Sequence, residues 1–217
     1  MTPVFDRRNF LKAAALVTAL GPIRVLGANE KVRIGVIGVG GMGSNLARRV
    51  AGDNNARLVA LADPDPAYRM QALKEELANA DRPVNVDTYV DYRRLLDRKD
   101  IDAVVIASPN YWHVLHSIHA LQADKHVYVE KPLSHTVWEG RQLVNLAKKS
   151  NKIAETGFHH RSRQCWPQVL DFIKQGKLGR VLTARGLCYK LRDGIGKLDA
   201  PGTPPSSCDY DLWLGPA

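Results

Sequence analysis

Three glycines at fixed spacing, Gly38-x-Gly40-x-x-Gly43, are the residues of this sequence best suited to hold a phosphate. They follow the apolar run Val32–Ile37 and precede a segment compatible with a helix. In such a unit the first glycine permits a tight turn, the second lets the backbone approach a pyrophosphate, and the third lets the helix pack on the strand. Glycine triplets also mark ordinary turns, so the flanking pattern matters. Together they predict a dinucleotide site that includes Met42.

Asp63 adds a second feature, about twenty positions beyond the last glycine, where the acidic residue of a dinucleotide site is expected. It directly follows another apolar run, Leu58–Ala62. A carboxylate there accepts hydrogen bonds from the adenosine ribose hydroxyls and repels a 2′-phosphate, so NAD is favoured over NADP as the cofactor. Arg69 is near enough in sequence to soften that preference. Alternatively, Asp63 caps the next helix or fixes the Asp63-Pro64-Asp65-Pro66 turn.

Polar side chains that could support redox chemistry follow two further apolar runs. They are Ser108, Asn110 and His113 after the first run, and Glu130 and Lys131 after the second. The carboxyl ends of strands in open α/β sheets are where ligands bind. A lysine there can hold a substrate hydroxyl and favour loss of its proton as hydride leaves the same carbon. Lys131 is therefore the candidate catalytic residue, and Glu130 either bonds a ribose hydroxyl or orients the lysine. Out of context, Glu-Lys-Pro would indicate a surface turn.

The elements that would position these side chains alternate along residues 31–153. Buried strands are expected at Val32–Ile37, Leu58–Ala62, Ile101–Ala107 and Val127–Val129, with a weaker strand at Val84–Val86. Helices are expected at Met42–Val50, Tyr68–Ala80, Tyr92–Leu96, Trp112–Gln122 and Val137–Lys149. This alternation predicts an α/β fold with a doubly wound parallel Rossmann sheet and right-handed crossovers.

Three motifs occur in a fixed order: Gly38-x-Gly40-x-x-Gly43, Ser108-Pro-Asn110-x-x-His113 and Glu130-Lys131-Pro132. Together they resemble the Gfo/Idh/MocA family of nicotinamide-dependent oxidoreductases, and the resemblance covers residues 31–217. It implies a Rossmann domain followed by a larger α/β domain, whose open and mostly antiparallel sheet covers the nicotinamide and often mediates oligomers. It also implies that Lys131 is the catalytic lysine. Asn110, His113 and Glu130 would lie around the nicotinamide and its ribose, with Ser108 among the cofactor-binding residues.

Residues 154–217 are expected to begin the second domain of that family. Gly157-Phe158-His159-His160-Arg161 resembles the family's Gly-Phe-x-x-Arg segment after the sixth strand. Arg161 would then approach the cofactor or substrate, unless it forms an ordinary surface salt bridge. An amphipathic helix is expected from Ser162 to Gly176 or Gly179, followed by a strand at Val181–Tyr189.

The last part of the sequence is expected to leave this second domain truncated. A long Gly- and Pro-rich loop, residues 193–207, precedes Asp209–Ala217. That final stretch resembles a segment that, in secreted family members, leads into the rest of the second domain. The family's later Asp…His pair does not occur in this sequence.

The first thirty residues predict an export signal. Arg7 and Arg8 precede the small apolar stretch Ala13–Leu20, and the segment resembles a twin-arginine signal, although Asp6 replaces the usual serine or threonine. Leu26-Gly27-Ala28 is a poor cleavage site, so the signal could stay attached as an anchor. The expected location is periplasmic or exported. The alternative is a basic, amphipathic first helix.

Composition argues against several other classes of protein. The formal charge of +9 lies partly in the targeting segment and is otherwise scattered, without a recognition-helix pattern, so nucleic-acid binding is not expected. No apolar run approaches the roughly 20 residues of a membrane-spanning helix. The three cysteines are far apart and predict neither a zinc site nor a disulfide. The steps from His113 to His116 to His119 sweep about 60° backward each time along a helix, which argues against a metal site.

Three functions remain open from the sequence. The first is an exported NAD-dependent oxidoreductase acting on a sugar, polyol or glycoside, as a homo-oligomer in the full-length protein. The second is an NAD-dependent glycosidase, in which transient oxidation enables elimination without net NADH production. The third is a non-catalytic NAD- or sugar-binding regulator on the same fold, against which the retention of Lys131 weighs.

Overall fold

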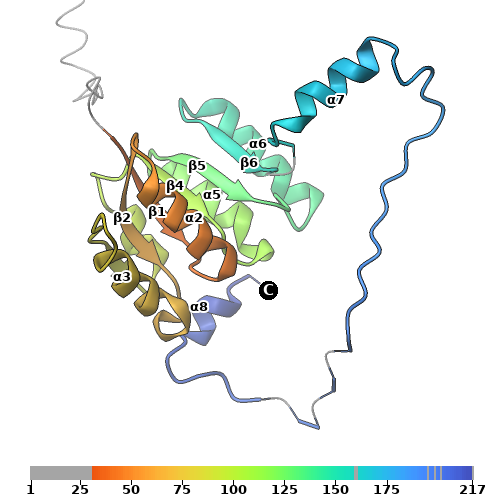
Figure 1. The fold of residues 1–217 in the computed structure, drawn as a ribbon. Helices are drawn as coiled ribbons and strands as arrows, with labels where there is room; N and C mark the ends of the chain where they lie inside the picture. The colour runs from red at the N-terminus through yellow and green to blue at the C-terminus, as the bar shows by residue number, and fades with distance from the viewer. Residues whose placement is uncertain (1–30, 159–160, 195, 198, 201, 217) are drawn as a thin grey trace, which may run out of the picture.

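The computed structural model describes residues 31–158, 161–194, 196–197, 199–200 and 202–216. The expected export signal lies outside the described residues. Within these ranges, six parallel strands form one sheet in the order β3-β2-β1-β4-β5-β6 (Figure 1). The strand order reverses between β1 and β4, the kind of position at which doubly wound sheets bind ligands. The predicted Rossmann sheet is confirmed.

The strands agree closely with the apolar runs, with one exception. They are β1 (Val32–Ile37), β2 (Ala56–Ala62), β3 (Asp87–Tyr89), β4 (Ala103–Ile106), β5 (His126–Glu130) and β6 (Ala154–Gly157). The expected strand at Val84–Val86 is wrong, because pairing with β2 begins only at Asp87, opposite Ala60. The Val84 N–H instead donates to the Leu77 carbonyl at 2.9 Å, which ties that segment to the preceding helix.

The helices of the Rossmann part follow the prediction with small shifts. They are α2 (Gly41–Gly52), α3 (Gln71–Ala78), α4 (Tyr92–Leu96), α5 (His113–Gln122) and α6 (Val137–Lys149). A single π-helical turn, Pro66–Met70, precedes α3, and a 3₁₀ turn, Asn110–Trp112, precedes α5. A capping box, in which Thr136 and Glu139 bond each other's backbone N–H groups, fixes the start of α6.

Two apolar layers hold the helices against opposite faces of the sheet. On one face, Ala47 of α2 and Leu73 and Leu77 of α3 pack with Val36 and Leu61. The other layer joins residues from α4, α5 and α6 to strand residues, including Leu95, Val114, Leu143, Ile37 and Ile106. Adjacent residues Val36 and Ile37 thus serve opposite layers, as the two-residue period of a strand requires.

The chain beyond β6 leaves the sheet and then returns to it (Figure 1). α7 (Cys165–Lys174) is a helix where one was predicted, and none of its residues is buried. The expected strand at Val181–Tyr189 is wrong: this stretch is extended and exposed, and it pairs with no described strand. Alternating residues suit a strand, but a strand also needs a hydrogen-bonding neighbour. A short helix, α8 (Tyr210–Leu214), lies beside the sheet near the end of the described chain.

None of the helices in the described ranges is long and apolar enough to cross a membrane.

Candidate functional site

The glycine loop joins the end of β1 to the start of α2 and is packed tightly at two of its three glycines. Gly38 has a positive φ of 84°, and a Cβ on it would lie 2.5 Å from the Ser108 backbone nitrogen. A Cβ on Gly43 would overlap the Gly38 carbonyl oxygen. Both positions therefore need glycine because of contacts within the protein.

Gly40 differs, because a Cβ there would meet nothing within 4 Å. Packing within the described chain does not demand glycine at this point. Gly40 is also the N-cap of α2, and no side chain caps that helix. The N–H groups of the first turn are thus available to an external acceptor, and the helix dipole favours a negative charge there. An open glycine above an uncapped helix start fits the pyrophosphate of a dinucleotide.

Asp63 braces this loop from the end of β2. Its Oδ2 accepts a 2.6 Å hydrogen bond from the Val39 N–H, and its Oδ1 accepts one of 2.9 Å from the Asp65 N–H. Burial raises the pKa of the Asp63 carboxyl, and these two hydrogen bonds oppose that rise. Each carboxylate oxygen retains a lone pair for a further donor. Asp63 therefore does fix the turn after β2, as one alternative from the sequence predicted. Its carboxylate can still accept hydrogen bonds from ribose hydroxyls.

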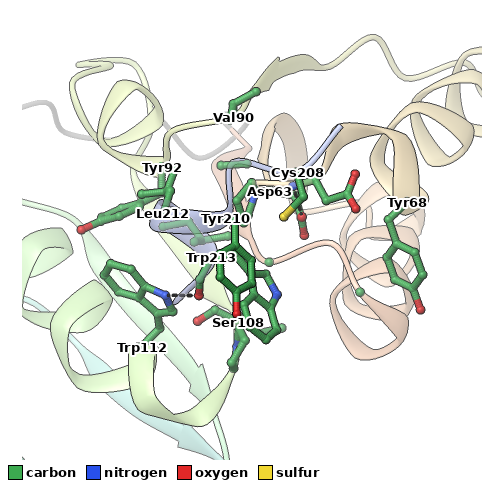
Figure 2. A pocket seen from close by; sticks show the side chains of 18 of the residues that line it. Asp63, Tyr68, Val90, Tyr92, Ser108, Trp112, Cys208, Tyr210, Leu212 and Trp213 are labelled. Atoms are coloured by element: carbon green, nitrogen blue, oxygen red, sulfur yellow. Dashed lines mark hydrogen bonds between the residues drawn. The ribbon is translucent and has the colours of Figure 1, made fainter. Parts of the chain in front are cut away.

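A cavity of about 510 Å³ lies over the carboxyl ends of β1, β2 and β4 (Figure 2). Its volume falls within the range of small-molecule and cofactor pockets. Four residues predicted to bind the cofactor lie together in its wall: Gly38, Gly40, Asp63 and Ser108. The position at the reversal of strand order is where a doubly wound sheet binds its ligand.

Residues 204–213, the strap, close one side of this cavity. The Asp209 N–H donates to the Pro64 carbonyl at 2.9 Å, and the Ser207 hydroxyl donates to Asp65 Oδ1 at 2.8 Å. At the other end of the strap, the Trp213 carbonyl accepts from the Trp112 indole N–H at 3.2 Å (Figure 2). The strap is thereby fixed both to the turn after Asp63 and to the start of α5.

His113 connects the loop after β4, which carries Ser108, to the loop after β5, which carries Lys131. The side chain is 2% exposed. Its Nε2 lies 2.8 Å from the Ser108 carbonyl oxygen, and its Nδ1 lies 2.6 Å from the Pro132 carbonyl oxygen. Both ring nitrogens are thus engaged by the protein backbone. Any effect of His113 on a cofactor would pass through the positions of these two loops.

The remaining predicted residues lie outside the cavity wall. Glu130 is 5% exposed, and its Oε1 accepts a hydrogen bond of 3.3 Å from the Tyr128 hydroxyl. Lys131 and Asn110 are exposed; Lys131 directly follows β5, and Asn110 begins the 3₁₀ turn after the loop that follows β4. Four others also lie outside the lining: Met42, Gly43, His113 and Arg161. The structure thus brings Gly38, Gly40, Asp63 and Ser108 together in one cavity wall. The binding and catalytic roles assigned to all of the predicted residues stay predictions.

Several cavity residues were missed from the sequence. They are the aromatic residues Tyr92 and Trp112, the buried His116, and strap residues including Cys208, Tyr210 and Trp213. For His116 the sequence predicts only that it is not a metal ligand, and for residues 209–217 it predicts only a link to the rest of a second domain. The signal in the sequence that could have indicated the strap is a long loop, residues 193–207, followed closely by the aromatic residues Tyr210 and Trp213. No group of three His, Cys, Asp or Glu side chains in the described ranges could hold a metal ion.

Comparison with known proteins agrees with this geometry. Glycosyl hydrolase family 109 protein 1 from Shewanella sp. (strain MR-4) is 32% identical over 81% of this chain and 44% of its own length. Inositol 2-dehydrogenase from Salmonella paratyphi B is 30% identical, over 73% of this chain and 46% of its own length. The chain thus spans less than half the length of these curated relatives.

A solved structure matches the fold. Scyllo-inositol dehydrogenase from Lactobacillus casei, with bound NAD(H) and scyllo-inositol, aligns with a TM-score of 0.62 at 27% identity. The alignment covers 69% of this chain and 43% of the other. Residues 32–158 match the Gfo/Idh/MocA family model, described as an oxidoreductase family with an NAD-binding Rossmann fold. The predicted family and its cofactor, NAD, are confirmed. The chain belongs to the Gfo/Idh/MocA oxidoreductase family.

Proposed function

We propose that this protein is an exported NAD-dependent oxidoreductase that transfers hydride between nicotinamide and a hydroxyl of a sugar, polyol or glycoside. The glycine loop carries the proposal, because Gly38 and Gly43 are required by packing whereas Gly40 leaves open space over an uncapped helix start. The names of the relatives, an inositol dehydrogenase and a glycosyl hydrolase, support a polyol or carbohydrate substrate.

The residues of the cavity divide the binding of the cofactor between them. The first-turn N–H groups of α2 would hold the pyrophosphate, and Asp63 would accept the adenosine ribose hydroxyls. Strap residues, including Cys208 and Trp213, line the same cavity. When bound, NAD supplies the hydride acceptor, and the protein supplies position and proton transfer.

Lys131 would act on the substrate. It directly follows β5 at the carboxyl edge of the sheet, and its exposed ammonium group is free to reach a substrate hydroxyl beside the cavity. There it would hold the hydroxyl and favour loss of its proton during oxidation. Glu130, which is buried, accepts a hydrogen bond of 3.4 Å from the Lys131 backbone N–H and would orient the lysine in this way.

The test is Lys131→Met in the whole protein, with the exposed Lys149→Met on α6 as the matched control. Single-turnover hydride transfer should fall by about 10²-fold or more for Lys131→Met, the usual range for a positioned proton-transfer group. NAD affinity and melting temperature should change little in either variant. If hydride transfer by Lys131→Met proceeds at the wild-type rate, Lys131 is not catalytic.

A second candidate is an NAD-dependent glycosidase, which the name of the Shewanella relative favours. Oxidation would be transient, so the enzyme would release a sugar from a glycoside without net NADH production. Absorbance at the NADH band during turnover separates the two enzymes. NAD binding without turnover of either substrate class would instead indicate a regulator.

Export is part of the proposal and is supported by Arg7 and Arg8 ahead of the apolar stretch Ala13–Leu20. A route that exports folded proteins would suit an enzyme that must carry its dinucleotide with it.

A further inference from the structure

His116, which contacts the predicted cofactor-binding residue Ser108 in the cavity wall, has no role in the proposed chemistry. The Ser108 Oγ lies 3.0 Å from His116 Nδ1, and both residues line the cavity (Figure 2 labels Ser108). His116 is 4% exposed. Its other ring nitrogen, Nε2, has no hydrogen-bond partner, and no other buried side-chain nitrogen or oxygen in the described ranges shares that condition.

Aromatic neighbours hold the His116 ring in place. The Trp112 ring stacks on it with centroids 4.5 Å apart and an angle of 16° between the planes. The Tyr92 ring contacts it with centroids 4.1 Å apart. Burial, together with the neighbouring His119 and His113, lowers the pKa of His116 to about 3. The imidazole is therefore neutral at physiological pH and carries one N–H.

The position of that single proton follows from the partners available. On Nε2 it would be a buried donor without an acceptor, an arrangement that native structures rarely contain. On Nδ1 it is donated to Ser108 Oγ. The hydroxyl of Ser108 then acts as the acceptor in this pair, and its own hydrogen stays free for a third group.

The free hydrogen of Ser108 lies beside the place expected for the cofactor. Ser108 adjoins the glycine loop so closely that a Cβ on Gly38 would lie 2.5 Å from the Ser108 nitrogen. Phosphate oxygens accept hydrogen bonds and donate none, so a dinucleotide requires donors from the protein. With the opposite tautomer, the Ser108 hydroxyl would donate its hydrogen to His116 Nδ1, and towards the cofactor it could act only as an acceptor.

We propose that His116 is a positioning residue: its Nδ1–H donates to Ser108 and so directs the Ser108 hydroxyl as a donor to the dinucleotide. The inference rests on the proposed function, because it takes the ligand of the cavity to be NAD. It assigns a role to a histidine that has no contact with the predicted catalytic residue.

The tautomer can be measured without any ligand. In the chain labelled with ¹⁵N-histidine, the resonances lost in His116→Asn identify the ring, and one-bond couplings show which nitrogen carries hydrogen. The proposal expects hydrogen on Nδ1 alone at pH 7. Hydrogen on Nε2, or on both nitrogens, would overturn it. The tautomer is measured in the wild-type chain, and a second variant, His116→Gln, can assign the ring if His116→Asn fails to fold.

The effect on the cofactor is measured by calorimetric titration with NAD. Ser108→Ala and His116→Leu should each weaken binding by about tenfold, the range for one hydrogen bond to a charged group. The double variant should lose no more than either single one, and His116→Asn, which keeps a donor near the Nδ1 position, should recover most of the affinity. His119→Gln, one turn further along α5 and bonded to Tyr92 rather than Ser108, is the matched control.

Additive losses in the double variant, or no recovery in His116→Asn, would show that His116 acts only by packing. If the wild-type chain bound no NAD, the proposed function would fail, and the tautomer measurement would still decide whether His116 donates to Ser108.

Discussion

Replacing Gly43 with alanine should destabilise the fold, because the glycine packs against backbone that has no room to move aside. The new Cβ would overlap the Gly38 carbonyl oxygen and lie 2.9 Å from the Gly38 carbonyl carbon and 3.4 Å from the Ala107 Cβ. Overpacking of this kind costs about 1–3 kcal/mol, and contact with backbone places this case near ~3 kcal/mol. For a chain of this size, that lowers the melting temperature by roughly 6–12 °C.

Gly40→Ala is the matched control, in the same loop and with the same added methyl group. Its Cβ meets nothing within 4 Å in the protein. The change from glycine to alanine at an N-cap costs only about 1 kcal/mol, so the melting temperature should fall by roughly 2–4 °C at most. The methyl group would, however, occupy the space through which a pyrophosphate approaches the start of α2. NAD affinity should therefore fall by about tenfold or more, equivalent to ~1.4 kcal/mol.

The two variants should show opposite patterns in two assays on the same preparations. Thermal unfolding followed by circular dichroism without NAD should single out Gly43→Ala. Calorimetric titration with NAD, at a temperature below the melting transition, should show a large loss of NAD affinity in Gly40→Ala, although that variant loses little thermal stability. Wild-type stability of Gly43→Ala would refute the packing argument, and wild-type NAD affinity of Gly40→Ala would refute the reading of the open space as the pyrophosphate site.

Two further predictions concern pH and export. The pKa of His116 is lowered to about 3 in the folded chain. As pH falls below about 6.5, this histidine becomes protonated in the unfolded chain but stays neutral in the folded chain. The contribution of the neutral His116 to the free energy of unfolding is therefore complete above pH 6.5 and is lost as pH falls towards 3. Urea unfolding should show this as a slope of about 1.4 kcal/mol per pH unit between pH 6 and 4, and an unchanged slope in His116→Leu would contradict it. For export, replacing Arg7 and Arg8 with lysine should leave the protein in the cytoplasm, since the twin-arginine route requires the guanidinium pair rather than charge alone; fractionation with an undiminished periplasmic yield would rule this out.

The elements that the sequence predicted well are those whose signal is local. β1 and α6 have the predicted bounds, Val32–Ile37 and Val137–Lys149, because an unbroken apolar run and a helix with a capping box are each determined by neighbouring residues. β3 was misplaced since its three residues carry little apolar signal and its register depends on β2. The stretch 181–189 alternates like a strand, but no described strand lies beside it to pair with.

The candidate site divides in the same way. The glycine spacing and Asp63 were predicted because they belong to one strand–turn–helix unit and the strand that follows it. The strap was missed because its contacts, such as the one from Trp112 to the Trp213 carbonyl, join residues far apart in the chain. His116 was missed for a different reason. Its position, three residues beyond His113, does not indicate that its Nε2 is buried without a hydrogen-bond partner.

The central claim is that the cavity beside Asp63 binds NAD through its ribose and pyrophosphate. The most direct test is calorimetric titration of the wild-type chain with NAD and with NADP, repeated on Asp63→Ser. The wild-type chain should bind NAD roughly 5- to 150-fold more tightly than NADP, because a 2′-phosphate beside the Asp63 carboxylate costs about 1–3 kcal/mol. Asp63→Ser should reduce that ratio towards one. Equal affinities in the wild-type chain, or a ratio that Asp63→Ser leaves unchanged, would contradict the claim.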